Sequence, residues 1–251
     1  MTVREFYAFM CEKIPPELSL NGDCDGLCCC PDAEREVNNV LIALDATDDV
    51  VDEAIEDGAD VILTHHPMIY GKIDGPVEGE YHADKIIKLI KNDISVMGFH
   101  TRLDAADGGV NDILARLLGL ENIEKFGEGN IGRIGDLQKA MTAEELAVFT
   151  RDTLGAPKVE LADHGRPIRR VAVVGGSGSS EVYSALFAGA DAFVTGDLKF
   201  HELTDAPDFG MTLIAAGHFY TENPVCARLF ELAAEAGAVP TITFSNRIKT
   251  I

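Results

Sequence analysis

The sequence contains no tryptophan, and aromatic residues make up only 7% of its 251 residues. Basic residues are also scarce, since 21 Lys and Arg stand against 42 Asp and Glu, which gives a formal net charge of -21. A negative field of this size repels phosphate backbones, so we expect no nucleic-acid partner. It does not exclude a small anionic substrate, because a bound multivalent cation reverses the potential locally.

Long apolar runs are absent as well. None reaches the ~18 residues that a membrane-spanning helix needs, so we expect no membrane association. The first residues, "MTVREFYAFMCEKI", are typical of an amphipathic helix rather than of a signal peptide, and Thr2 and Glu5 have the spacing of a capping box. With 46% hydrophobic residues, the composition is that of a soluble globular protein, and we expect it in the cytoplasm.

The cysteines cluster in the stretch "CDGLCCC", which begins at Cys24. An iron–sulfur motif of the form C-x3-C-x2-C would need a cysteine at position 31, where Pro31 stands. Three consecutive cysteines also do not easily turn toward one metal ion. We favour small buried hydrophobic residues on a strand in a reducing compartment, with a metal or disulfide role as the alternative.

Apolar β-type runs alternate with segments of helical periodicity along the chain. Strands that are apolar throughout, separated by helices of about ten or more residues, are typical of parallel strands covered on both faces. The sequence therefore predicts an α/β fold with two α/β lobes, mostly parallel strands and flanking helices. The expected strands are 37–44, 60–64, 94–99, 169–174, 191–195, 211–216 and 240–244, and the expected helices are 48–58, 80–91, 109–118, 142–154, 179–189 and 222–236.

The rhythm breaks near the middle of the chain. The passage "LENIEKFGEGNIGRIGDLQ" (120–138) is polar and rich in glycine, which is typical of a connection between domains. We therefore predict an N-terminal lobe over 1–126 and a C-terminal lobe over 127–251.

Histidine and acidic residues follow four of the predicted strands directly. In open α/β sheets, ligands bind beyond the carboxyl ends of the strands, so these positions are candidates for a functional site. The residues are His65 and His66 after 60–64, His100 and Asp104 after 94–99, Asp197 and His201 after 191–195, and His218 and Glu222 after 211–216.

Local geometry decides whether neighbouring side chains reach one centre. On a continuing strand, His65 and His66 would point to opposite faces. Pro67 favours a departure from β geometry, because it restricts the residue before it to extended or turn conformations. His218 and Glu222 are four residues apart at an expected strand–helix turn, which brings both side chains to the same side.

Three imidazoles and two carboxylates form a mixed nitrogen and oxygen donor set, which suits divalent Zn, Fe, Mn or Co. Five ligands exceed what one closed tetrahedral zinc site needs, so the pattern favours two metal ions that share a bridging carboxylate. The predicted ligands are His65, His66, Asp104, His218 and Glu222. His100, Asp197 and His201 are candidates for outer hydrogen-bond partners or proton-transfer groups, and an ordinary capped loop is the alternative for each.

The stretch "VAVVGGSGSS" (171–180) combines a strand, a glycine-rich turn and a helix start. This order is found where backbone amides bind phosphate. The third glycine of G-x-G-x-x-G is missing, because Glu181 stands there, and no Walker lysine follows. A tight strand-to-helix turn is the favoured interpretation.

Five stretches, in this order and at these spacings, resemble the NGG-one-interacting-factor-three-like family of dinuclear metal centre proteins, also named type-two GTP cyclohydrolase I homologues. They are "DVILTHHPMIY", "HTRLDAADGGVND", "VAVVGGSGSS", "DAFVTGDLKFHE" and "AAGHFYTENPV". The resemblance implies a two-lobed α/β fold, a dinuclear metal site in the crevice between the lobes, and a toroidal homohexamer built as a trimer of dimers. The family's ligands fall on the same five residues that the spacing indicates.

One element departs from the family pattern. Where the family usually carries Trp-Asp-Asn-x-Gly-Leu, this chain has "GDCDGL", so Gly22 and Cys24 replace the Trp and the Asn while Asp23 remains.

Two functions follow as hypotheses from the candidate residues and the resemblance. The first is a metal-dependent hydrolase in which activated water attacks a small molecule, a purine nucleotide if the family name applies. The alternative is a non-catalytic protein that stores or delivers metal, or binds a partner in a metal-dependent way.

Overall fold

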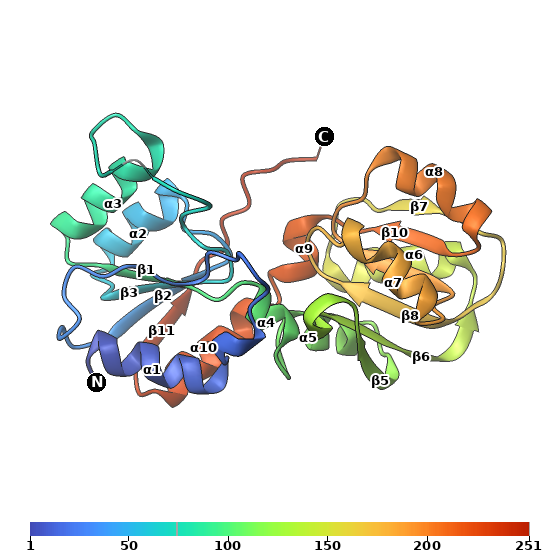
Figure 1. Ribbon diagram of the computed structural model, residues 1–251, viewed down its shortest axis with the longest axis horizontal. Coiled ribbons are helices and arrows are strands. Elements are labelled where there is room, and N and C mark those ends of the chain that lie inside the picture. Colours follow the sequence, from blue (N-terminus) through green and yellow to red (C-terminus); the bar gives the residue numbers. More distant parts are fainter. Residues whose placement is uncertain (74, 251) are drawn as a thin grey trace. The chain divides into compact units, whose positions relative to one another are not determined.

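The computed structural model describes residues 1–73 and 75–250, and the chain divides into two compact units. The first unit consists of Met1–Leu103 together with Val225–Arg247. The second consists of Asp104–Pro224 and the short stretch that begins at Ile248. Figure 1 labels the elements of both.

This division differs from the predicted boundary between residues 126 and 127. The chain leaves the first unit at Leu103 and returns to it at Val225. It returns because strand β11 (Val239–Ile242) pairs in parallel with β2 (Asn39–Ala43), while helix α10 (Val225–Glu235) packs on both strands. The C-terminal segment thus completes a sheet that the N-terminal segment begins.

The first unit contains a five-stranded sheet in the order β1-β4-β3-β2-β11. β2, β3, β4 and β11 pair in parallel, and β1 joins the edge antiparallel to β4. The remaining strands are β1 (Gly26–Cys29), β3 (Val61–Thr64) and β4 (Ser95–Gly98). All residues of β3 and β4 are buried, as predicted for strands that are covered on both faces.

Helices cover both faces of this sheet (Figure 1). Leu41 and Ile62 share one hydrophobic cluster with Val50 of α2 and Leu89 of α3, so α2 and α3 lie on that face. α1 and α10 lie on the opposite face. The bounds are α1 (Val3–Lys13), α2 (Asp48–Glu56), α3 (Tyr81–Lys91), α4 (Thr101–Ala105) and a 3₁₀ turn, η1 (Pro16–Leu18).

The second unit contains a six-stranded sheet in the order β5-β6-β8-β9-β10-β7. Only its centre, β8-β9-β10, is parallel among the described strands, because β5, β6 and β7 all pair antiparallel with their neighbours. The prediction of mostly parallel strands therefore describes the first sheet and not the second. The bounds are β5 (Glu121–Phe126), β6 (Gly132–Met141), β7 (Glu160–Ala162), β8 (Ile168–Val174), β9 (Ala192–Thr195) and β10 (Thr212–Ala215).

The polar passage 120–138, which we expected to be a domain boundary, is a β-hairpin of β5 and β6. The connection holds only residues 127–131, too few for the crossover that parallel pairing requires. Gly127 and Asn130 adopt φ angles of 82° and 60°, which let the chain reverse. β5 is largely exposed at the sheet edge, and this explains its polar composition.

Capping residues mark the start of two predicted helices, α6 in the second unit and α1 in the first. Thr142 caps α6 through a reciprocal pair of hydrogen bonds with Glu145. Thr2 and Glu5 do the same for α1, so the capping box predicted there is confirmed. α8 was not expected. The bounds are α5 (Val110–Leu117), α6 (Ala143–Leu154), α7 (Val182–Phe187), α8 (Phe200–Phe209) and α9 (His218–Glu222), with 3₁₀ turns η2 (Glu128–Asn130) and η3 (Ser179–Glu181).

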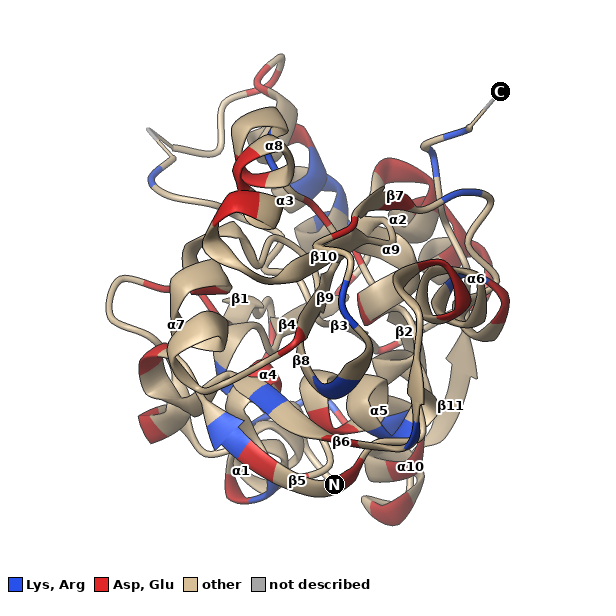
Figure 2. Ribbon diagram, turned by 90° about the vertical axis from the view of Figure 1, so that its right-hand side faces the viewer, with Lys and Arg blue, Asp and Glu red and all other residues tan. Residues whose placement is uncertain are grey.

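The negative charge is spread over the helices. Figure 2 shows acidic residues on α2, α6 and α10 among others, with fewer basic residues between them. In α2 the acidic residues alternate with the apolar ones that reach the core, as expected for a solvated helix face. Within the described residues, no helix is both long and apolar enough to cross a membrane.

The hydrogen bonds of Asp60 in the first unit lead to a testable prediction about stability. Its buried carboxylate accepts hydrogen bonds from the backbone amides of Asn38 (2.8 Å) and Asn39 (3.0 Å) and pairs with Arg35 (2.8 Å). Burial alone would raise the pKa of Asp60, but these bonds to the charged form outweigh burial and lower it. We expect Asp60→Asn to reduce the free energy of unfolding by about 1–3 kcal/mol at pH 7, measured by urea denaturation.

The pH dependence follows from the sign of this shift. Because the folded-state pKa is lowered, the contribution of Asp60 is complete above the unfolded pKa of about 4 and is lost as the pH falls through the folded value. The difference between the wild type and Asp60→Asn should therefore shrink on acidification. Asp57→Asn, at the exposed end of α2, is the control and should change stability by less than about 0.5 kcal/mol. Equal losses of stability in the two variants would refute the stabilising role assigned to the Asp60 carboxylate.

Candidate metal-binding site

In the first unit, three histidine rings stand together at the carboxyl ends of β3 and β4. The ring centroids of His65 and His66 are 4.8 Å apart, and those of His100 lie 5.4 Å and 5.7 Å from them. One ring nitrogen from each of the three lies within 4.8 Å of the others. The expectation that the chain leaves β geometry after Thr64 is confirmed, because β3 ends there and the two neighbouring rings converge.

The turn that holds the histidine pair is fixed by its backbone. The Thr64 hydroxyl donates to the His66 carbonyl (2.6 Å), and the His66 amide donates to the Leu44 carbonyl (3.0 Å). Across from it, Gly98 of β4 leaves room for the turn, since a Cβ there would stand 2.9 Å from the Cα of Pro67. The sequence at position 98 is therefore constrained by close approach rather than by backbone conformation.

Each of the three imidazoles is oriented through its Nδ1 atom. His65 Nδ1 lies 2.9 Å from the Phe99 carbonyl, His66 Nδ1 lies 2.8 Å from Asp45 Oδ1, and His100 Nδ1 lies 2.9 Å from Asp23 Oδ1. The Phe99 carbonyl can only accept, so His65 Nδ1 carries the proton. This leaves Nε2 with its lone pair, and an Nδ1–H donor to a carbonyl or carboxylate is the usual arrangement of a metal-binding histidine.

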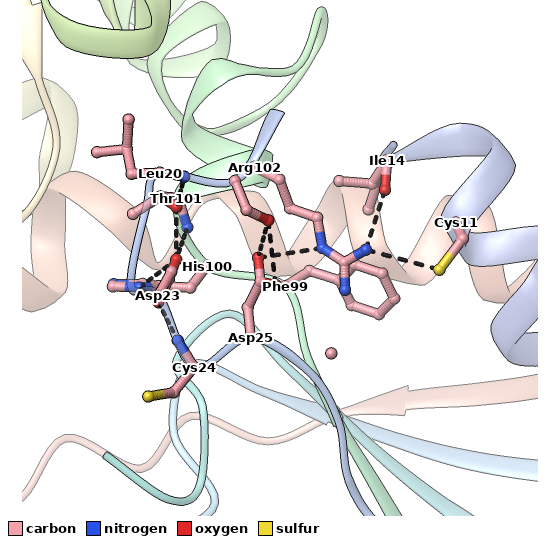
Figure 3. A network of polar contacts seen from close by, with 12 residues as sticks. Cys11, Ile14, Leu20, Asp23, Cys24, Asp25, Phe99, His100, Thr101 and Arg102 are labelled. Atoms are coloured by element: carbon pink, nitrogen blue, oxygen red, sulfur yellow. Dashed lines mark hydrogen bonds and ion pairs between the residues drawn. The ribbon is translucent and has the colours of Figure 1, made fainter. Parts of the chain in front are cut away.

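Asp23 is a partner that the sequence did not assign to the site. Its carboxylate accepts from the Thr101 amide (3.0 Å) and the Thr101 hydroxyl, in addition to its contact with His100 (Figure 3). Burial by itself would raise the pKa of Asp23, but the bonds from His100 and Thr101 outweigh it and hold that pKa well below the usual range. Asp23 is therefore a fixed carboxylate that orients His100.

A buried ion pair anchors the segment that carries Asp23. Arg102 is 1% exposed; its Nε lies 3.1 Å from Asp25 Oδ2, and its guanidinium stands 4.3 Å from the centre of the Phe99 ring. The guanidinium also donates to the Ile14 carbonyl at the end of α1 (3.4 Å). These contacts join the 20–26 segment to α1 and α4 (Figure 3). They hold the segment "GDCDGL" against the rest of the first unit.

In the second unit, His218 and Glu222 occupy one side of the short helix α9. His218 Nε2 lies 3.0 Å from Glu222 Oε2, and His218 Nδ1 lies 2.6 Å from Asp197 Oδ2. Burial alone would lower the pKa of His218, but the carboxylates of Asp197 and Glu222 outweigh it and raise that pKa to about 10. Two carboxylates around one imidazole stabilise a positive charge, carried either by a proton on the ring or by a metal ion.

Three amides of the glycine-rich turn after β8 donate to side chains of the protein itself. The Gly175 amide donates to Asn111 Oδ1 (2.7 Å), and the Gly176 amide donates to Thr221 Oγ1 (3.0 Å). The Gly178 amide is likewise taken by the hydroxyl of Thr195 (2.9 Å). The favoured interpretation, a tight strand-to-helix turn, accounts for these contacts.

The remaining predicted residues differ in their surroundings. Asp104 is 9% exposed in α4, and its carbonyl accepts from the Asn111 side chain (3.5 Å). Asp197 contacts His218, as a hydrogen-bond partner of that ring should. His201 is exposed on α8, and within the described residues no contact joins its ring to Asp197 or His218.

Two cysteines, Cys29 and Cys226, are buried and pack as small hydrophobic residues. Burial raises the pKa of Cys29 to about 11 and that of Cys226 to about 12, so neither is a thiolate near neutral pH. Within the described residues, the groups of side chains close enough to share a metal ion contain histidine, aspartate and glutamate but no cysteine.

This assignment predicts selective alkylation. In the native protein, iodoacetamide at pH 8 should leave Cys29 and Cys226 unmodified, because both thiols are buried and protonated. The partly exposed Cys24 and Cys30 should react first. Peptide mass mapping before and after unfolding in urea provides the measurement. Rapid native modification of Cys226 would contradict the buried assignment.

Sequence comparison places these features in a known context. The family described as Duf34/NIF3 (NGG1p interacting factor 3) matches residues 1–250. A "GTP cyclohydrolase 1 type 2 homolog" of Clostridium perfringens is 36% identical over 211 residues, covering 81% of this chain and 80% of that protein. A relative of the same name in Methanocaldococcus jannaschii is 31% identical over 223 residues, covering 88% and 90%.

Solved structures agree with the sequence matches. A Bacillus cereus protein related to NIF3 superposes with a TM-score of 0.85 at 25% identity, covering 100% of this chain and 98% of that one. Reduced HcgD from Methanocaldococcus jannaschii superposes with a TM-score of 0.85 at 26% identity, covering 96% and 97%. The α/β architecture with two sheets and flanking helices is thus shared along the whole length of these chains.

Proposed function

Because the chain belongs to the Duf34/NIF3 (NGG1p interacting factor 3) family, we propose that it binds two divalent metal ions and uses them to hydrolyse a small molecule. The proposed ligands are His65, His66, Asp104, His218 and Glu222. The observation that carries the proposal is the histidine pair of the first unit. One ring nitrogen of His65 lies within 4.8 Å of one of His66, and the Nδ1 atom of each ring meets an oxygen acceptor.

The donor set fits such ions. Neutral imidazole nitrogens and carboxylate oxygens suit Zn, Fe, Mn or Co, whereas sites for harder cations are built from oxygen alone. Neither histidine of the 65–66 turn needs to reorganise to offer Nε2, because the Nδ1 atoms are already held by Phe99 and Asp45. Preorganised rings lose little conformational entropy when they bind a metal ion.

Divalent ions bound by these residues would supply a Lewis acid that lowers the pKa of water and polarises an electrophilic carbon or phosphorus centre. The residues around them would orient the reactants. Asp197 fixes the ring of His218, and Asp23 fixes His100, whose Nε2 lies 3.2 Å from the Tyr70 hydroxyl. These contacts support the proposal that His100 and Tyr70 touch the substrate. The exposed His201 is less suited to this role than the sequence suggested.

The names of the relatives point to a purine nucleotide as the substrate class, with hydrolytic opening of the purine ring as the reaction. A chain with a formal charge of -21 needs a local positive charge to hold a phosphorylated ligand, and the metal ions would provide it. The proposed chemistry and the acidic composition are therefore compatible.

Metal content tests the ligand assignment. We expect about two divalent ions per wild-type chain by elemental analysis, and a loss of at least half of them in His66→Asn and in Glu222→Gln. His82→Asn and Glu144→Gln are matched controls, because neither residue belongs to a group of potential ligands among the described residues, and both should retain the wild-type content. Fewer than one ion per wild-type chain would refute metal binding altogether.

Turnover tests the hydrolase assignment. A panel of nucleotides and phosphoesters should include a substrate whose hydrolysis is abolished by a chelator and restored by adding back the metal. Turnover that persists after substitution of both His65 and Glu222 would refute metal-dependent hydrolysis. Two bound ions without turnover on any member of the panel would instead support the alternative, a protein that stores or delivers metal.

We also propose a homohexamer, a trimer of dimers, on the strength of the family resemblance. Size-exclusion chromatography with light scattering should then give a mass six times the 27.0 kDa of one chain. A monomer or a simple dimer at micromolar concentration would contradict this proposal and leave the metal assignment untouched.

A further inference from the structure

The backbone of one residue, Gly176, joins three turns of the second unit. The Gly176 carbonyl, after β8, accepts hydrogen bonds from the amides of Gly196 (2.9 Å) and Asp197 (3.0 Å), after β9. The Gly176 amide donates to Thr221 Oγ1 (3.0 Å) in α9, after β10. Asp197 contacts the His218 ring, and Thr221 directly precedes Glu222. The backbone of Gly176 therefore contacts a neighbour of each residue of the His218–Glu222 pair.

The space beside Gly176 is filled by the pair itself. A Cβ built on this residue would lie 1.9 Å from Glu222 Oε1, 2.8 Å from Glu222 Cδ and 3.0 Å from His218 Nε2. No side chain is compatible with the observed position of the Glu222 carboxylate. The φ angle of +62° also favours glycine, but many loop glycines share that property.

A second glycine makes the approach of the turns possible. A Cβ on Gly196 would stand 2.6 Å from the Gly176 carbonyl oxygen and 2.7 Å from the Cα of His218. The turns after β8, β9 and β10 are therefore packed backbone against backbone. A side chain at Gly196 would meet backbone atoms, so it would separate the turns and move the carboxylate of Asp197 away from the His218 ring.

We propose that Gly176 is a positioning residue for the His218–Glu222 pair. Its missing side chain provides the volume that the Glu222 carboxylate occupies. Its carbonyl fixes Asp197, and its amide fixes Thr221. The inference rests on the proposed function, because it assigns to Gly176 the placement of two of the proposed metal ligands.

The kind of atom involved in the clash determines the expected defect. The nearest atom is the end of a flexible side chain, so an alanine at position 176 is accommodated when the Glu222 carboxylate swings away. The fold then survives and the ligand is displaced. A Cβ that met backbone instead would disturb the packing of the sheet. The inference therefore predicts a loss of metal binding that exceeds the loss of stability.

The experiment compares Gly176→Ala with Gly155→Ala in the full chain. Gly155, at the end of α6, has a φ of +66°, close to the +62° of Gly176, and a Cβ there would meet nothing within 4 Å. Both substitutions carry the same backbone strain, so both should lower the Tm of the metal-free protein to a similar extent. Only Gly176→Ala has the additional contact with the pair.

Cobalt(II) is the probe, because its visible absorption bands report the geometry of its ligands. We expect Gly176→Ala to weaken cobalt binding about tenfold or more and to change the band positions, while Gly155→Ala retains the wild-type affinity and spectrum. Equal affinities and spectra in the two variants would overturn the inference. A wild-type protein that binds no cobalt would refute the proposed function first, and the inference with it.

A compensating variant separates positioning from folding. Glu222→Asp shortens the side chain by one methylene, so the cost of Gly176→Ala in cobalt affinity should be smaller in the Glu222→Asp background than in the wild type. The same cost in both backgrounds would overturn the inference. So would failure of Gly176→Ala to fold in both backgrounds while Gly155→Ala folds, because Gly176 would then serve the sheet rather than the pair.

Discussion

Burial of the parallel strands on both faces is the constraint on which the candidate site depends. Four parallel strands consist entirely of buried residues: β3, β4, β9 and β10. A charged or polar side chain on either face of these strands would lose its hydration, which costs free energy. Functional groups can emerge only where these strands end. His65, His100, Asp197 and His218 all follow a strand end within three residues. The fold thus determines where chemistry is possible before any ligand is considered.

Each side chain at a strand end then needs a partner that fixes its direction. The Phe99 carbonyl serves His65, while carboxylates serve the other rings: Asp45 for His66, Asp23 for His100 and Asp197 for His218. Three acidic partners near histidines are consistent with the acidic composition of the chain. The carboxylates raise the basicity of the imidazoles and so strengthen them as ligands for a cation.

The sequence predicted the features that depend on neighbouring residues, and it missed those that depend on contacts between distant residues. The strand–helix rhythm predicted both parallel sheet centres and the turn at His65 and His66, because these features depend on neighbouring residues. The contact between Asp23 and His100 spans 77 positions, and the pairing of β11 with β2 closes a sheet across most of the chain, so neither could be read locally. The β5–β6 hairpin was missed because exposed edge strands lack an apolar pattern.

Two glycines illustrate a constraint that backbone conformation alone does not reveal. Gly176 has a positive φ, so a rule based on conformation would mark it, but it would mark Gly155 equally. Gly98 lies in a regular strand, and no such rule would mark it, yet a Cβ there would stand 2.9 Å from the Cα of Pro67. At Gly98 the obstacle is backbone, so a side chain would displace the whole histidine turn. At Gly176 the obstacle is one carboxylate, so a side chain would displace a ligand and leave the fold in place.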